Sequence, residues 1–99
     1  MSNVTMTREE KPGRGRYVGK LEGFTGEAAL TYTRANPAIV IADHTVTPVS
    51  MRGHGVATAL VERLVADARS EGFRIVPLCS FVEAQFDLHP EWADLRAFR

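Results

Sequence analysis

A glycine-rich turn between a β-branched run and a long amphipathic segment constrains the fold of this chain more than any other feature. The run Ala38–Ala42 is continuously apolar, as expected of a strand that is covered on both faces. From about Gly53 to Glu71, apolar residues recur every three or four positions, which predicts a helix with one buried face. Gly72 is placed to end that helix. A helix packed on a sheet is therefore expected.

The remaining segments extend this order of elements. Arg16–Leu21 and Ala28–Arg34 are expected strands, and the short gaps between them indicate antiparallel hairpins. Phe73–Cys79 follows the long helix, so it is expected to join the sheet as a parallel strand through a crossover. Ser80 is expected to cap a second helix over Phe81–Leu88. We therefore expect an α+β fold: a mostly antiparallel sheet with one parallel β-α-β crossover and helices packed on it.

Composition narrows the classes of function. The 99 residues contain 12 Lys and Arg against 12 Asp and Glu, so no bulk charge favours a nucleic acid or an anionic membrane as partner. No apolar run approaches the roughly 20 residues of a membrane span. The single cysteine, Cys79, allows no internal disulfide, and we expect a cytoplasmic protein. Residues 1–15 are polar and are expected to form a flexible arm before one domain over residues 16–99.

The turn itself has a chemical interpretation. The first four N–H groups of a helix lack internal partners and point outward at the positive end of the helix dipole. Gly53 and Gly55 would let a ligand approach the backbone closely. These features predict a phosphate or pyrophosphate site that needs no net positive charge, with Arg52 as one charge-assisted contact. The alternative is a strand-to-helix turn whose glycines only relieve steric crowding.

Two other nucleotide sites fit less well. Gly53–Thr58 has the spacing of GxGxxG, but threonine replaces the third glycine. Pro48 and further residues separate the strand from the turn, and 99 residues cannot supply the second half of a dinucleotide fold. A Walker A loop would need GK[ST], which the chain lacks.

The motif resembles that of a known superfamily. The six residues Arg52-Gly53-His54-Gly55-Val56-Ala57 match the [Q/R]-x-x-G-x-[G/A] motif of the GNAT acetyltransferases, and Val46-Thr47-Pro48 precedes it as V-x-P does there. The chain is most similar to small single-domain GNAT-like proteins, with which it shares His44-Thr45, Pro77-Leu78-Cys79-x-Phe81-Val82 and His89-Pro90-Glu91. The resemblance covers roughly Arg16 to Leu95.

This resemblance implies acetyl-CoA as cofactor and an unidentified amine as acceptor. The pyrophosphate would lie on the amides of the turn, and the pantetheine arm along the strand edge just before it. The thioester would lie between that strand and Ile75–Cys79, where two parallel strands splay apart, and Pro77 fits such an opened ladder because it has no N–H. The implied cofactor-binding residues are Thr45, Val46, Thr47, Arg52, Gly53, His54, Gly55, Val56 and Ala57.

The residues that would carry the chemistry are less clearly marked. Many larger GNAT enzymes use a tyrosine on the helix after the last strand as the acid, but Phe81–Leu88 contains none. Cys79 is our candidate for an acetyl relay or for the acid, and otherwise a small buried residue. His44 is our candidate for a general base or for orienting Cys79, and otherwise a structural histidine. A backbone N–H near Val46 is the expected oxyanion donor.

Two further alternatives concern a metal site and a function without catalysis. His44, Cys79 and His89 lack the short ligand spacing of a zinc site, so no metal is expected. The missing tyrosine and the small size also favour a non-catalytic module that binds acetyl-CoA as a sensor or interaction partner.

Overall fold

The structure is a computed structural model and describes residues 4–97. It consists of a five-stranded sheet in the order β1-β2-β3-β4-β5, with the helices α1 and α2 and two short 3-10 segments. Every neighbouring pair of strands is antiparallel except β4 and β5. The α+β fold with one parallel pair is therefore confirmed. The bounds are β1 Val4–Lys11, β2 Arg14–Leu21, β3 Ala28–Asn36, β4 Ile39–Val46, η1 Val49–Met51, α1 Val56–Glu71, β5 Arg74–Pro77, α2 Ser80–Leu88 and η2 Pro90–Leu95.

Strand β1 corrects the expectation of a flexible arm over residues 1–15. Residues 1–3 lie outside the described residues, but Val4–Lys11 pairs along its whole length with β2. Lys11 and Arg14 form the last pair of the hairpin, and the turn between them is Pro12-Gly13. Gly13 has φ 81°, which is the conformation that the second central residue of a type II turn requires. The polar strand is therefore held by its turn and by its pairing with β2.

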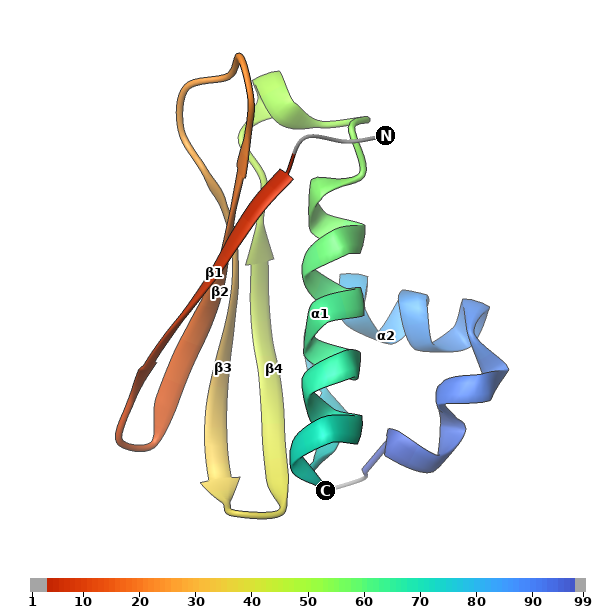
Figure 1. Cartoon of the computed structure of the whole chain (residues 1–99). Helices are drawn as coiled ribbons and strands as arrows, with labels where there is room; N and C mark the ends of the chain where they lie inside the picture. Colours follow the sequence, from red (N-terminus) through yellow and green to blue (C-terminus); the bar gives the residue numbers. More distant parts are fainter. Residues whose placement is uncertain (1–3, 98–99) are drawn as a thin grey trace.

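One face of the sheet is covered and the other is not. In Figure 1 the helices α1 and α2 lie on the same side of the sheet, and no element within residues 4–97 covers its other face. The buried side of α1 carries the apolar stripe that the sequence predicts, and all of its members except Ala57 are buried. These residues pack against inward-facing side chains of β2 and β3, including Tyr17 and Leu30. The molecule thus has one core layer and one open sheet face.

Strand β4 contains a bulge that reverses the direction of its last side chains. Tyr32 of β3 pairs with Ala42, whereas its neighbour Thr31 pairs with His44, so Asp43 is the extra residue. Paired residues place their side chains on the same face of a sheet. Thr45 pairs with the buried Leu30 and therefore faces the helices, whereas His44 faces the open side of the sheet.

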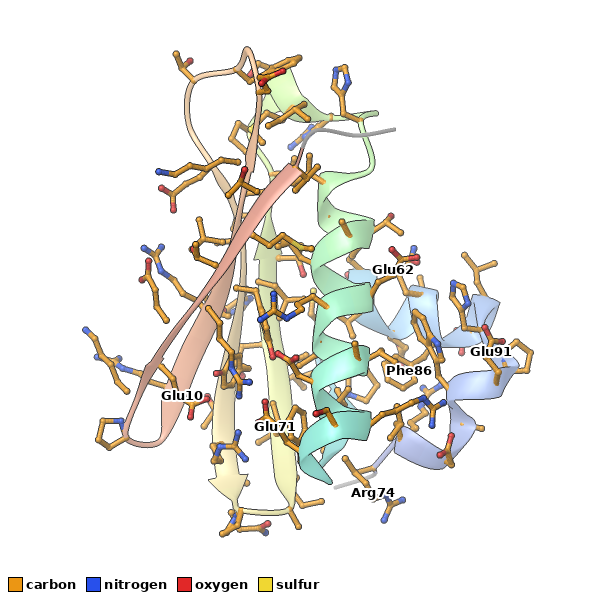
Figure 2. The ribbon with its side chains drawn as sticks, viewed as in Figure 1. Glu10, Glu62, Glu71, Arg74, Phe86 and Glu91 are labelled. Atoms are coloured by element: carbon orange, nitrogen blue, oxygen red, sulfur yellow. The ribbon has the colours of Figure 1, made fainter. Side chains whose placement is uncertain are left out.

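The end of the chain closes over the last strand. Strand β5 is shorter than the expected Phe73–Cys79, and the N-cap of α2 is Cys79 rather than Ser80, which is the first helical residue. Phe86, labelled in Figure 2, lies in the space between α1, α2 and η2, where its ring meets the edge of Trp92 at 5.5 Å. The N–H of Ala97 then donates to the Ile75 carbonyl at 2.7 Å. The C-terminal segment therefore anchors α2 beside β5.

The described helices are all short or polar. None of those within residues 4–97 is both long enough and apolar enough to cross a membrane.

Candidate functional site

The sequence-predicted turn lines a hollow at the N-terminal end of α1. The hollow has a volume of about 490 Å³, and five elements meet around it: the end of β4, η1, the turn, the first turn of α1 and the start of α2. Seven of the predicted binding residues line it, namely Thr45, Thr47, Arg52, Gly53, Gly55, Val56 and Ala57. The lining also includes Met51, Thr58 and Phe81, which are not among the predicted binding residues. The structure therefore gathers most of the predicted set around one cavity.

The backbone of the turn depends on its two glycines. Gly53 has φ 86° and Gly55 has φ 75°, both in the left-handed region that favours glycine. A Cβ atom at either position would meet no protein atom within 4 Å. The protein's own packing therefore does not require the absence of a side chain here, and the conformation leaves open backbone facing the hollow.

Helix α1 begins later than the expected Gly53, at Val56, with Gly55 as its N-cap residue. The Ala59 N–H donates to the Gly55 carbonyl at 3.0 Å, and the amides of the three residues before Ala59 have no partner within the helix. No side chain caps the helix, and no acidic residue lies in its first turn. The positive end of the helix dipole therefore faces the hollow without a competing carboxylate.

Next to the turn, β4 runs past the end of its ladder with β5. Pairing between β4 and β5 ends at Ala42 and Pro77, while β4 continues through Val46. The Cys79 N–H still donates to the Ala42 carbonyl at 2.9 Å, but among the described residues no later residue of β5 pairs with β4. The ladder of the two parallel strands therefore stops at Pro77, the end of β5, which is where the resemblance implies that the strands separate.

Cys79 lies at the start of this separation and has an unusual environment. Its sulfur lies 3.4 Å from the Thr45 hydroxyl oxygen. Burial raises the pKa of the Cys79 thiol, but the Thr45 hydroxyl and the backbone N–H groups of Val82, Phe81 and Thr45 outweigh that effect. The pKa therefore lies below its usual value, which favours the nucleophilic thiolate. Thr45 is thus a polar partner of Cys79, a role that sequence reasoning did not give it.

His44 is not brought to Cys79. Its side chain is exposed on the open face of the sheet and lines a second hollow, whereas its neighbour Thr45 faces the helices with Cys79. Simple alternation from Ala42 would have given the opposite arrangement, and the bulge at Asp43 is the physical reason for the change. His44 therefore cannot orient the thiol through its side chain, but it can act on a group that approaches from the open face.

Two other predicted residues lie outside the lining of the first hollow. His54 packs the edge of its ring on Phe24, with 4.8 Å between the ring centroids, so it tethers the turn to the loop after β2. Val46 pairs with Ala29 of β3, and its side chain is 65% exposed. The side chains of both residues therefore lie away from the first hollow.

Both tyrosines of the chain belong to another cluster of hydrogen-bonded and charged side chains. Tyr17 donates its hydroxyl hydrogen to Asp67 at 2.7 Å, and Tyr32 donates to Glu10 at 2.6 Å. Burial and these acceptors raise the pKa of both phenols. Arg8 lies against both rings and forms ion pairs with three carboxylates, including Asp67. Neither tyrosine replaces the acid that is missing from α2.

Comparison with known proteins identifies the family of this chain. Residues 4–97 contain no cluster of three or more His, Cys, Asp and Glu side chains that could hold a metal ion. A search of curated proteins returned no match. The family model described as GCN5-related N-acetyl-transferase matches residues 16–95, which span the sheet from β2 onward, the turn, both helices and η2. The chain therefore belongs to the family of GCN5-related N-acetyltransferases.

Proposed function

We propose that this protein transfers an acetyl group from acetyl-CoA to an amine. The observation that carries the proposal is the continuity of three features: open glycine backbone at the N-terminus of α1, the end of β4 beyond its ladder with β5, and a thiol of lowered pKa just past the end of that ladder. The turn and Thr45 of β4 line the first hollow, and Cys79 is connected to it through its contact with Thr45. This order suits a long ligand with an anionic end and a reactive thioester end.

The residues present fit such a ligand. The amides from Arg52 to Ala57 would hold the pyrophosphate, because the left-handed glycines leave room for close approach and the helix dipole favours an anion. The Thr45 carbonyl and the main chain of Thr47, just beyond the end of β4, would pair with the amides of the pantetheine arm. Met51 is fully buried beneath the turn and gives it a fixed apolar support. Bound acetyl-CoA supplies an activated acetyl group as a thioester.

Cys79 is our proposed acetyl relay. Its thiolate forms the new S–C bond to the acetyl carbon as the original thioester bond breaks, and the departing thiolate takes a proton from solvent. The backbone N–H groups of Thr45, Phe81 and Val82, which lower the pKa of the thiol, would also stabilise negative charge developing on the acetyl oxygen. A nucleophile rather than an acid is favoured because a lowered pKa leaves less of the protonated form.

His44 is our proposed base on the acceptor side. Its ring is exposed on the open face of the sheet, one residue from Thr45, whose hydroxyl contacts Cys79. An amine that arrives from that face can transfer its proton to His44 as its nitrogen bonds to the acetyl carbon and the S–C bond to Cys79 breaks. Because the two residues act from opposite faces, the roles of nucleophile and base do not compete for space.

Calorimetric titration of acetyl-CoA into the purified protein tests the cofactor, with NAD as the control ligand. Saturable heat with acetyl-CoA and none with NAD is expected, together with thermal stabilisation of about 2.7 kcal/mol at 100-fold excess over Kd. Release of free CoA in the presence of a broad panel of amines then tests transfer. Binding with a release rate equal to that of buffer would instead identify a non-catalytic acetyl-CoA-binding module. No binding would mean that the turn is structural.

Mass spectrometry tests the relay separately. Incubation with acetyl-CoA without an amine should add one acetyl group to the protein, and Cys79→Ala should abolish the adduct while acetyl-CoA binding persists. Lys20→Ala is a control, because Lys20 is an exposed amine on β2 outside the first hollow. An adduct that survives in the Cys79→Ala protein would exclude the relay.

A further inference from the structure

A second hollow, which neither the family motif nor the proposed cofactor uses, lies on the open face of the sheet. Its volume is about 520 Å³, similar to that of the first. Strands β1 to β4 all contribute to it, and most of its side chains belong to the face that no helix covers. The lining residues that matter here are Lys11, Arg14, Arg16, Thr33, Asp43 and His44.

Part of the charge in this hollow is already paired. Arg16 is neutralised by Glu9 at 2.8 Å and lies 3.8 Å from Glu27. Lys11 and Arg14 sit at the hairpin end of β1 and β2, are exposed, and form no salt bridge with any described residue. One end of the hollow therefore presents two cations that are not neutralised by an ion pair.

The opposite end presents a carboxylate. The Thr33 hydroxyl donates to one oxygen of Asp43 at 2.7 Å, which fixes the carboxylate and leaves its second oxygen for another donor. Arg14 pairs with Thr33, and Thr33 in turn pairs with Ile41 on β4, the strand that carries Asp43. The cationic and anionic ends thus lie two strand spacings apart, roughly 10 Å between backbones.

We propose that this hollow binds the acceptor, and that the acceptor is a short amine that also carries an anionic group, a carboxylate or a phosphate. Arg14 and Lys11 would take the anionic group, and Asp43 would take the ammonium end. The assignment of this ligand as acceptor rests on the proposed function, whereas its binding does not. Charge complementarity at both ends selects a zwitterionic ligand over a simple amine or a simple acid.

The position of Asp43 connects the hollow with the thiol. The residues on either side of the pair Asp43-His44 both contact Cys79: the Ala42 carbonyl accepts its N–H, and the Thr45 hydroxyl lies against its sulfur. From Asp43 onward no ladder bond joins β4 to β5. An amine held at Asp43 therefore lies beside the part of β4 where the sheet is open and next to His44, which would accept its proton.

The test is a titration followed by the backbone amide shifts of the 99-residue protein in NMR spectra, with three probes. The probes are 5-aminopentanoate, pentylamine, which lacks the carboxylate, and pentanoate, which lacks the amine. We expect 5-aminopentanoate to shift amides of Arg14, Thr33 and His44 and to bind at least five-fold more tightly than either of the other probes. Equal affinity for all three probes, shifts confined to other regions, or no binding by any probe would overturn the proposal.

Single substitutions test the cationic and the anionic end of the hollow separately. Arg14→Gln, which leaves Lys11 in place, should lower the affinity for 5-aminopentanoate toward that of pentylamine and leave the affinity for pentylamine unchanged. Asp43→Asn should lower it to that of pentanoate. Lys20→Gln is the matched control, because Lys20 lies on the same face of β2 but outside the lining of the hollow. An equal loss of affinity in Arg14→Gln and Lys20→Gln would show that the overall charge of this face, and not a specific contact, controls binding. That result would refute the site.

The failure of this inference is distinguishable from failure of the proposed function. Acetyl-CoA is titrated separately and should shift amides of the turn at Gly53 and Gly55. Loss of those shifts with intact binding of 5-aminopentanoate would refute the cofactor but not the hollow. With both ligands present, acetylation of 5-aminopentanoate should exceed that of pentylamine at least five-fold at equal low concentration. Preference for pentylamine would refute the hollow as the acceptor site even if transfer occurs.

Discussion

Gly55→Ala is the most informative perturbation of the cofactor site, because the chain contains its own control. Gly55 and Gly72 flank the two ends of α1, with φ 75° and 82° respectively, and a Cβ at either position meets nothing within 4 Å. Alanine in a left-handed conformation costs roughly 1–2 kcal/mol at either position. A loss of 1 kcal/mol corresponds to a fall in Tm of about 4–8 °C in a domain of this size. Both variants should therefore fold and lose similar stability.

Binding should distinguish the two variants. Only Gly55 belongs to the turn that lines the first hollow, so only there would the new methyl group hold a phosphate away from the helix amides. Loss of one hydrogen bond to a charged group costs about 1.5–3 kcal/mol, which is roughly a 10- to 150-fold rise in Kd. Calorimetric titration with acetyl-CoA well below each variant's Tm measures this difference.

The reasoning fails if the two variants bind acetyl-CoA equally well. That result would place the pyrophosphate away from the Gly55 backbone, because the strain is matched and only the location differs. A fall in affinity in both variants would show instead that the rigidity of α1, and not access to its first amides, controls binding.

Two further predictions concern side chains. Because the pKa of the Cys79 thiol is lowered, its alkylation by iodoacetamide should reach half of its maximal rate at a lower pH than the alkylation of a free cysteine. Thr45→Val should move that midpoint to a higher pH. An unchanged midpoint would show that Thr45 does not lower the pKa of the thiol. Arg8→Met should lower the free energy of unfolding by about 2 kcal/mol in urea, because it removes one ion pair of the partly buried Asp67, which keeps Tyr17 and Arg63 as partners. Arg69→Met, whose partner Asp94 is exposed, should have a much smaller effect.

The elements with local signals could be predicted from the sequence. The apolar stripe of α1 and its terminal Gly72 follow from helical periodicity, and the β-branched part of β4 follows from composition. Strand β1 was missed because only Val4 and Met6 alternate as apolar residues, and the rest of the strand is polar. The turn Pro12-Gly13 was the available signal, since it favours a type II hairpin between two extended segments.

The backbone segments that form the site could be predicted from the sequence, but the directions of their side chains could not. The turn residues lie together because they are consecutive, and Pro77 indicated where β4 and β5 separate. The sheet faces on which the side chains of His44 and Thr45 lie could not be predicted. A single extra residue at Asp43 exchanges these faces, and no local sequence pattern indicates a bulge. Contacts that join distant segments, such as Thr45 with Cys79, depend on that register.

The bulge also explains how a small domain can serve two ligands. In a regular strand the side chains of His44 and Thr45 would exchange faces, so the hydroxyl that contacts Cys79 would point to the open side. The extra residue keeps Thr45 with the thiol on the helix side and places Asp43 and His44 beside the second hollow. Deleting Asp43 would remove the bulge but keep both faces, because Ala42, His44 and Thr45 would then be consecutive and would alternate as they do now. That deletion and Asp43→Asn should therefore both weaken binding in the second hollow and leave the lowered pKa of the Cys79 thiol in place.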